Sequence, residues 1–314
     1  MNAPRDRIIE ASGLTKRFDA VAAVDGLTFA VHRGEIFGLV GPDGAGKTAT
    51  MRMLAGVMQP DTGSIVIDGI DVVSDPEEGK QHISYMPQRF GLYEDLTVDE
   101  NIRFYADLFE VPADAREQRA ERLLAASGMS QFRSRLAGQL SGGMKQKLGL
   151  TCALVHTPQI LLLDEPTTGV DPVSRRDFWR ILYNLREEGV TIVISTAYLD
   201  EAERCNRLAL LHGGRVLYCD TPAALKTRMP GAVVAIVSGS GRQVRSAIVA
   251  LEGVSNVILI GGGAHAVVDD ARLRIPELRN ALQRENVPFD DIAVAAPSIE
   301  DVFVALLEDE RKAQ

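Results

Sequence analysis

Residues 41–48 read Gly41-Pro42-Asp43-Gly44-Ala45-Gly46-Lys47-Thr48 and decide how the first part of the chain folds. They follow a short apolar run, residues 36–40, and open into a helical pattern that begins at Lys47. Glycines let successive backbone N–H groups point at phosphate oxygens, Lys47 reaches the β- and γ-phosphates, and the Thr48 hydroxyl can ligate Mg²⁺. The stretch therefore predicts a strand, a phosphate-binding turn and a helix in a nucleotide-binding protein.

The composition is that of an ordinary soluble globular protein. Of the 314 residues, 46% are hydrophobic and 25% are charged, and the chain is long enough for two domains. The longest apolar runs, such as residues 160–163 and 232–237, are much shorter than the ~18 residues that span a bilayer. No signal segment opens the chain, so we expect a cytoplasmic location.

The charge and the cysteines exclude several classes of protein. A net charge of −9 and a pI near 5.2 argue against broad attraction to nucleic acid or anionic lipid. Cys152, Cys205 and Cys219 form no CxxC pair, so we expect thiols in a reducing compartment rather than a disulfide or a metal site. The five histidines show no ligand spacing.

Short apolar runs alternate with helical patterns over the first two thirds of the chain. Runs bounded by polar or turn residues predict strands, many of them buried on both faces, at residues 65–67, 160–163, 191–195 and 208–211. Between residues 97 and 127 the pattern is helical. Thr97 and Glu100 have the spacing of a capping box, and Leu108, Leu123 and Leu124 take apolar positions. We expect a helical insert in an α/β domain.

The pattern changes near Met229-Pro230-Gly231, where we place a domain boundary between residues 1–228 and 229–314. The second part reads as a split βαβ arrangement, which predicts a small α+β, ferredoxin-like domain. No residue in it clusters as a catalytic site. The expected elements are a strand at 232–237, a helix at 244–251, two strands around 261–263, a helix at 276–284, a strand at 292–295 and a closing helix at 298–308.

Two carboxylates and a serine-glycine motif add to the phosphate-binding turn. Asp164 and Glu165 end an apolar strand, which delivers charge to the carboxyl edge of a parallel sheet, where ligands bind. Asp164 suits Mg²⁺ and Glu165 suits activation of water, although the same pair also occurs as a helix cap or a surface pair. Ser141-Gly142-Gly143 begins a helix and could bind a phosphate through free N–H groups, or be only a serine cap with flexible glycines.

The order of these motifs resembles the ATP-binding subunits of ABC transporters. It is completed by Tyr85-Met86-Pro87-Gln88 before the serine-glycine motif and by Gly169-Val170-Asp171-Pro172 after the carboxylates, and it covers roughly residues 8–228. The resemblance implies an α/β P-loop ATPase domain with a mixed sheet and a helical subdomain at about 90–155. It also implies that two such domains enclose two ATP molecules, each held by residues 41–49 of one subunit and Ser141-Gly142-Gly143 of the other.

The resemblance further implies a role for each matched residue. Glu165 is the general base, and Lys47 stabilises the transferred phosphoryl group. Thr48 and Asp164 bind Mg²⁺, and Gln88 senses Mg²⁺ and the attacking water. Gln88 also links the site to a transmembrane permease on a separate chain, and Asp171 lies in a loop that communicates between the two ATP sites. Phe18 matches an aromatic that stacks on adenine, and a role as a core aromatic is the alternative.

The end of the chain indicates which group within this family the sequence resembles. Residues 297–303, Pro-Ser-Ile-Glu-Asp-Val-Phe, are similar to the tail of ATP-binding subunits of type-2 exporters of the daunorubicin-resistance group. The implied function is ATP hydrolysis that energises a membrane exporter, with the protein attached to the inner face of the membrane through the permease. The second domain could be regulatory, brace a dimer or only stabilise the chain.

Two positions depart from the family pattern. Ala197 stands where the family usually has a histidine that contacts the γ-phosphate, and loss of such a donor typically costs ~10² to 10³ in rate. We expect slow hydrolysis, or a substitute donor such as Thr196 or Tyr198. Ala49 replaces a common hydroxyl that contacts the α-phosphate, which lowers the expected ATP affinity.

Several alternatives stay open at this point. The chain could form a homodimer, or a heterodimer with a second ATP-binding subunit in which one composite site is weak. It could also be a regulatory ATP-binding subunit that does not hydrolyse ATP, or a soluble ABC-type protein that is not tied to transport. The acidic balance and the single ATP site argue against an ABC-type machine acting on nucleic acid.

Overall fold

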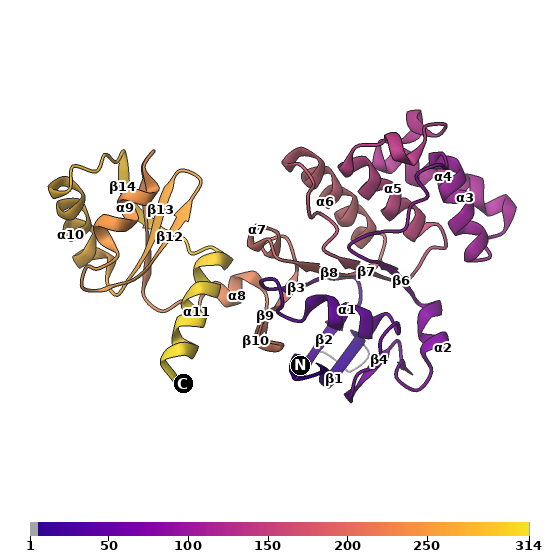
Figure 1. The fold of residues 1–314 in the computed structure, drawn as a ribbon, viewed down its shortest axis with the longest axis horizontal. Coiled ribbons are helices and arrows are strands. Elements are labelled where there is room, and N and C mark those ends of the chain that lie inside the picture. The colour runs from indigo at the N-terminus through magenta and orange to yellow at the C-terminus, as the bar shows by residue number, and fades with distance from the viewer. Residues whose placement is uncertain (1–5, 314) are drawn as a thin grey trace. The chain divides into compact units, whose positions relative to one another are not determined.

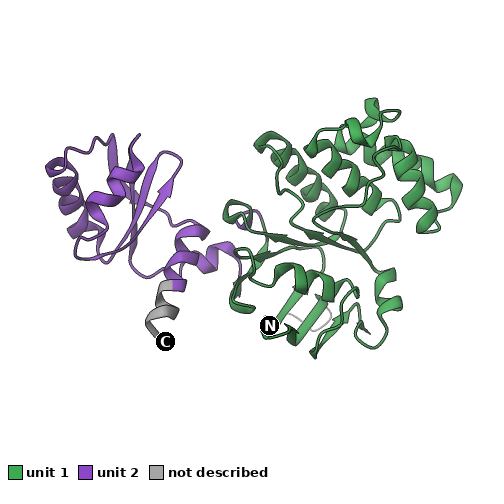
Figure 2. Cartoon of the chain, in the orientation of Figure 1, with its two compact units in different colours: residues 1–201, 205–219 green, residues 202–204, 220–314 purple. Residues whose placement is uncertain are grey.

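The computed structural model describes residues 6–313, with side chains through residue 307. Its contacts divide the chain into two compact units (Figure 2). The first reaches to residue 201 and includes residues 205–219, and the second consists of residues 202–204 and the chain from residue 220 onward. The second unit thus begins before residue 229, because helix α8 (Pro222–Lys226) contacts helix α11 (Ile299–Ala313).

A six-stranded sheet carries the phosphate-binding turn in the first unit. Its order is β10-β9-β3-β8-β7-β6, and strands β9 through β6 in that order pair in parallel (Figure 1). Every residue of β3, β7 and β8 is buried, which explains the apolar runs at residues 36–40, 160–163 and 192–194. The strands are β3 (Ile36–Val40), β6 (Ile83–Met86), β7 (Ile160–Asp164), β8 (Thr191–Thr196), β9 (Arg207–His212) and β10 (Arg215–Asp220).

A second sheet of the same unit is antiparallel and has the order β2-β1-β4-β5. Helix α1 (Lys47–Leu54) lies between the two sheets (Figure 1), and one core cluster joins Met51 of this helix to Phe29 and Phe37, whose rings stack 5.4 Å apart. The sequence did not predict the two long strands, because register shifts between them interrupt the alternation of buried and exposed residues. The strands are β1 (Arg7–Phe18), β2 (Val21–His32), β4 (Thr62–Ile67) and β5 (Ile70–Asp71).

The helical insert has its own apolar core. The predicted capping box is confirmed, since the Glu100 N–H donates to the Thr97 hydroxyl and the Thr97 N–H donates to the Glu100 carboxylate. Leu124 is buried, but the expectation for Leu108 is wrong, because its side chain is 62% exposed while Ile102 and Ala106 fill the core. The insert contains α3 (Val98–Leu108), α4 (Ala113–Ser127), the short 3₁₀ turns η2 (Ser130–Phe132) and η3 (Ala137–Gln139), and α5 (Gly142–Leu154).

The remaining helices of the first unit connect its strands. Helix α2 (Pro76–Gln81) begins at an Asp75 cap, and helix α6 (Pro172–Glu187) begins at an Asp171 cap. The short helix α7 (Leu199–Ala202) follows β8. Over the residues that the structure describes, no helix combines the length and the apolar character needed to cross a membrane.

The second unit has the predicted split βαβ order, with an antiparallel sheet in the order β12-β13-β11-β14. The expected bounds of two helices are wrong. Helix α9 spans Gly241–Ile248 rather than 244–251. Helix α10 begins at Ala271 rather than at Pro276, because the Asp270 carboxylate caps an earlier turn by accepting from two backbone N–H groups. The elements are β11 (Ala232–Val237), α9 (Gly241–Ile248), β12 (Val254–Ile260), β13 (Gly263–Val268), α10 (Ala271–Arg284) and β14 (Asp291–Ala295), followed by α11.

Candidate active site

The turn of residues 41–48 requires glycine at several positions. Gly44 and Gly46 have φ of 78° and 97°, in the left-handed region that glycine adopts without strain. A Cβ atom on Gly41 would lie 2.3 Å from the Leu211 carbonyl oxygen, and one on Gly46 would lie 2.4 Å from the Ala23 carbonyl oxygen. The turn is therefore closely enclosed by backbone from β9 and β2, as its sequence predicts.

The start of α1 offers free backbone donors. The N–H groups of Lys47, Thr48 and Ala49 have no recorded acceptor within residues 6–313, whereas the Thr50 N–H bonds the Gly46 carbonyl at 2.9 Å. Such free N–H groups, together with the positive end of the helix dipole, favour an anion. The methyl group of Ala49 packs against the core, so this residue contributes only its backbone to the helix start.

The Lys47 ammonium lies inside the turn. It donates to the carbonyl oxygens of Gly41 at 2.9 Å and Pro42 at 3.0 Å, and it lies 3.0 Å from Glu165 Oε1. Its side chain is only 4% exposed. A buried cation in contact with a turn of free N–H groups gives this corner of the sheet a strong preference for negatively charged oxygen atoms.

Asp164 is buried at the end of β7 and is held by three hydroxyl groups. Its Oδ1 accepts from Ser195 Oγ at 2.6 Å and from Thr48 Oγ1 at 3.2 Å, and its Oδ2 accepts from the Tyr85 hydroxyl at 3.3 Å. Burial and then the charge of Asp164 raise the pKa of Tyr85 to about 12, so the phenol keeps its proton and donates it. The structure thus brings together Thr48 and Asp164, as predicted.

These oxygen donors fit a magnesium site that is completed by phosphate. Mg²⁺ prefers hard oxygen ligands and is commonly held by one or two protein groups plus substrate phosphates. Thr48 and Asp164 provide one hydroxyl and one carboxylate within 3.2 Å of each other. Within the described part of the chain, no group of three or more His, Cys, Asp or Glu side chains could hold a metal by itself.

Glu165 adopts a strained backbone conformation beside the turn. Its φ is +48°, which is uncommon for a residue with a side chain and is found mostly where function requires it. Its N–H lies 2.9 Å from Ser195 Oγ and its Oε2 accepts from Gln88 Nε2 at 3.1 Å and Thr168 Oγ1 at 3.3 Å. The structure therefore places Gln88 and Lys47 on the two oxygens of one carboxylate.

Sequence reasoning missed three residues of this site, namely Tyr85, Thr168 and Ser195. A signal for Ser195 existed, since it ends the apolar strand β8, and parallel strands end at one edge of a sheet. The register pairs Ser195 directly with Asp164. No comparable sequence signal pointed to Tyr85, whose hydroxyl reaches Asp164 from the neighbouring strand β6.

The serine-glycine motif lies apart from the turn within this chain. Ser141 caps α5 by accepting from the Met144 N–H at 3.3 Å, and no hydrogen bond to residues 41–48 is recorded over the described residues. Gly143 faces α6, where an added Cβ would lie 2.5 Å from Ser174 Oγ. Asp171 caps that helix, and hydrogen bonds from Ser174 lower the pKa of its carboxyl.

Two sequence alternatives are resolved by exposure and hydrogen bonding. Phe18 is 48% exposed at the end of β1, so a role as a core aromatic is wrong, and stacking on adenine stays a prediction. The Thr196 hydroxyl donates to Glu201 at 2.8 Å and accepts from the Tyr198 N–H. The Thr196 proton is therefore already donated to Glu201. Thr196 cannot replace the histidine that the family usually has at the position of Ala197, which is exposed here.

Curated relatives match this chain along most of its length. The family model described as ABC transporter matches residues 24–168. The probable multidrug ABC transporter ATP-binding protein YbhF of Escherichia coli is 44% identical over 96% of this chain and 52% of that relative, so the chain spans about half its length. The daunorubicin/doxorubicin resistance ATP-binding protein DrrA of Streptomyces peucetius is 34% identical over 98% of this chain and 94% of that relative.

Solved structures agree with these relatives. A structure of the ATP-binding subunit of an ABC transporter is 32% identical, with a TM-score of 0.64 over 70% of this chain and 92% of that one. A dimeric post-hydrolysis state of an ATP-binding cassette bound to ADP and Pi is 25% identical, with a TM-score of 0.62 over 68% of this chain and 98% of that one. The chain therefore belongs to the family of ABC transporter ATP-binding proteins.

Proposed function

We propose that this protein binds Mg²⁺-ATP and hydrolyses it to energise an exporter whose permease is a separate chain. The observation that carries the proposal is the convergence of Lys47 and Glu165, with buried Asp164 beside them, on the free N–H groups of a helix start. Phosphoanhydride hydrolysis needs a cation, a metal holder and an oriented nucleophile in this arrangement. The export direction is supported by the names of the relatives, which include multidrug transporter and daunorubicin resistance proteins.

The contacts support a proposed role for each group in the reaction. Water attacks the γ-phosphorus, the bond to the β–γ bridging oxygen breaks, and Glu165 accepts the proton of the water. Gln88 and Thr168, which donate to one oxygen of Glu165, orient this carboxylate. Lys47 offsets the charge that develops on the phosphate oxygens. Mg²⁺ supplies further charge neutralisation when it is held by Thr48 and Asp164, with Gln88 beside them.

The composite site requires a second ATP-binding subunit. Ser141 and Gly142 lie away from the turn of the same chain and are exposed, whereas Gly143 is buried against α6. We infer that this helix start covers ATP held by residues 41–48 of a partner and that Phe18 stacks on the adenine. The partner is a second copy or a related subunit. The permease holds the pair at the cytoplasmic face of the membrane.

A second candidate is a subunit with impaired hydrolysis that pairs with an active one. Ala197 supplies no side-chain donor, and the Thr196 hydroxyl is already used by Glu201. The Tyr198 ring lies beneath the Arg175 guanidinium, 4.3 Å from it. In this arrangement the serine-glycine motif would complete the active site of the partner. Robust ATP turnover by the purified protein alone would exclude this candidate.

Equilibrium binding of ATP with and without Mg²⁺ tests the proposal directly. We expect magnesium-dependent uptake that Lys47→Ala weakens by about 10- to 100-fold, because the substitution removes a charge-assisted contact. Lys80→Ala is the matched control, since Lys80 is an exposed lysine that pairs only with Glu77 in the recorded ion pairs of residues 6–313. Equal loss in the two variants, or no uptake by the unchanged protein, would exclude the assignment.

A further inference from the structure

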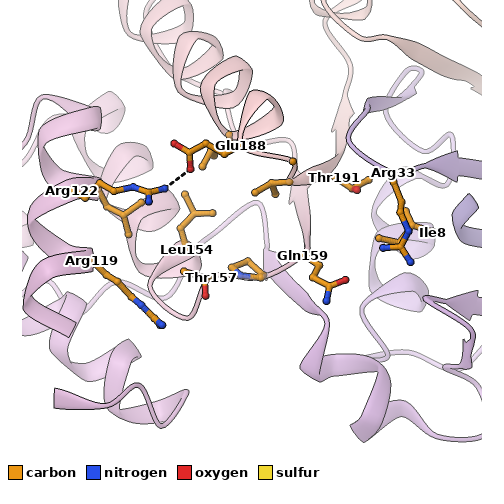
Figure 3. A pocket seen from close by; sticks show the side chains of 14 residues that line it. Ile8, Arg33, Arg119, Arg122, Leu154, Thr157, Gln159, Glu188 and Thr191 are labelled. Atoms are coloured by element: carbon orange, nitrogen blue, oxygen red, sulfur yellow. Dashed lines mark hydrogen bonds and ion pairs between the residues drawn. The ribbon is translucent and has the colours of Figure 1, made fainter. Parts of the chain in front are cut away.

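A cavity of about 440 Å³ lies in the first unit, away from the phosphate-binding turn (Figure 3). It is lined by Gln159, which precedes β7, and by Val190 and Thr191, at the start of β8. Asp164 and Ser195 stand at the other ends of these two strands. The cavity is therefore at the amino edge of the sheet, opposite the candidate active site, and its volume is typical of a small-molecule site.

The inner walls of the cavity are apolar. Ile8 of β1, Leu154 of α5 and Leu185 of α6 line it and are 2%, 5% and 7% exposed. Leu123 of α4 and Val190 add half-buried apolar surface. Because these side chains come from the helical insert as well as from the sheet and α6, an occupant would contact both parts of the first unit and exclude water from apolar surface.

Three arginines surround this apolar space. Arg119 and Arg122 extend from α4 on one side, with Arg122 paired to Glu188, and Arg33 lies across the cavity (Figure 3). Arg33 pairs with Asp68. Arg119 donates to the Val155 carbonyl oxygen at 3.1 Å and has no recorded carboxylate partner among the described residues. One uncompensated cation thus lines an apolar cavity in a chain with a net charge of −9.

The neutral polar groups of the lining also have donors to offer. Thr191 is 1% exposed, and its Oγ1 accepts from the Gly34 N–H at 3.0 Å. Within the described part of the chain, no acceptor is recorded for the hydroxyl proton of Thr191 or for the side-chain amide of Gln159. A ligand with acceptor oxygens would satisfy these donors together with Arg119.

We propose that this cavity binds a small amphipathic carboxylate. The carboxylate contacts Arg119, where the contact is charge-assisted, and the apolar body lies against Leu154, Leu185 and Ile8. A neutral molecule of the same shape leaves Arg119 without a carboxylate partner, and a cationic one is repelled by it. The bound molecule connects α4 and α5 to the sheet, so it braces the helical insert against the strands that carry Asp164 and Ser195.

Calorimetric titration of the full chain with decanoate, decanol and decyltrimethylammonium tests this assignment. We expect saturable binding of decanoate below its micelle concentration, with weaker binding of the alcohol and weakest binding of the cation. Arg119→Gln should weaken decanoate binding by about 10- to 100-fold, because it removes a hydrogen bond between charged groups. Arg180→Gln is the matched control, since Arg180 is a 70% exposed arginine on α6 that is absent from the lining.

A second variant tests the apolar body independently of charge. Leu123→Trp places a larger side chain in the cavity and should reduce decanoate binding while leaving the preference for the carboxylate over the alcohol. Saturating Mg²⁺-ATP should not displace decanoate, and Lys47→Ala should bind decanoate normally, so the result is independent of the proposed function. Equal binding of decanol, unchanged decanoate binding in Arg119→Gln, or no saturable binding of decanoate by the unchanged protein would overturn the proposal.

Discussion

Two helix starts in the first unit bear glycines and free backbone donors, but they differ in the chemistry around them. The start of α1 has Lys47 within 3.0 Å of Glu165 and Thr48 within 3.2 Å of buried Asp164. The start of α5 has the Ser141 hydroxyl, which caps the helix, and Lys145, which pairs with Glu94. Both starts favour an anion, yet only the first also carries charged groups for metal binding and proton transfer. The glycine-rich pattern alone therefore does not distinguish a catalytic surface from a covering surface.

The largest expected effect comes from removing the charge at the first helix start. Glu165→Gln should lower kcat for ATP hydrolysis by ~10² to 10⁴, because an amide cannot accept the proton of water. ATP binding should persist, since Lys47 and Asp164 are unchanged. Single-turnover hydrolysis and equilibrium binding measure the two quantities separately.

The control for this experiment is Glu77→Gln, because Glu77 is 82% exposed and pairs with Lys80 rather than with a residue of the site. Undiminished hydrolysis by Glu165→Gln would remove the proposed general base beside α1 and end the contrast between the two helix starts.

A smaller effect should follow from restoring a donor at the end of β8. Ala197→His supplies a side-chain donor next to Thr196, whose own hydroxyl donates to Glu201, and one such donor is typically worth ~10² to 10³ in rate. Turnover of the two proteins at saturating ATP gives the comparison. No gain would show that the missing imidazole does not limit hydrolysis.

The second helix start should respond differently. Ser141→Ala removes the cap of α5, which typically costs about 1 kcal/mol of stability, while ATP uptake by the isolated subunit should not change. Denaturant unfolding and equilibrium binding on the same samples measure both quantities. A loss of uptake comparable to that of Lys47→Ala would mean that the two helix starts act on one nucleotide within one chain.

The smallest expected effect comes from removing an ion pair in the second unit, between His265 and Asp301. His265 Nδ1 lies 3.0 Å from Asp301 Oδ2, and this hydrogen bond raises the pKa of His265. A raised folded-state pKa gives stability that is fully present below the ordinary histidine pKa and is lost as pH rises through the folded value. His265→Gln should therefore destabilise the chain at pH 5.5 more than at pH 9.

Hydrogen exchange of β13 amides in the full chain at the two pH values, corrected for the intrinsic rates, measures this difference. Burial opposes ionisation of Asp301, but hydrogen bonds from His265 and Ser298 outweigh it and lower the pKa of the carboxyl. The carboxylate is thus charged at both pH values. An equal effect of His265→Gln at pH 5.5 and pH 9 would show that the charge of the imidazole does not hold α11.

Much of this architecture could be predicted because local sequence and final environment agree. The buried strands β3, β7 and β8 contain short apolar runs, and the turn at residues 41–48 needs its glycines where neighbouring backbone approaches. Strands β1 and β2 were not predicted, since register shifts obscure their alternation. At the site, Lys47, Asp164 and Glu165 followed from motif spacing.

Other contacts of the site depend on pairing between distant segments. Tyr85 and Ser195 reach Asp164 only because β6, β7 and β8 are neighbours in one sheet, and the sequence does not state that order. The cavity beside Arg119 has the same origin, because its walls come from segments far apart in the chain.

The close approach of two carbonyl oxygens to Gly41 and Gly46 has a consequence for nucleotide exchange. Leu211 and Ala23 leave no room beside the turn, and the backbone that crosses there belongs to two different sheets. The cradle for the phosphates is thereby fixed in shape, and local opening would require strands to separate. In the proposed two-subunit site, product would leave through retreat of the opposing subunit, and the rate of subunit separation would then limit product release.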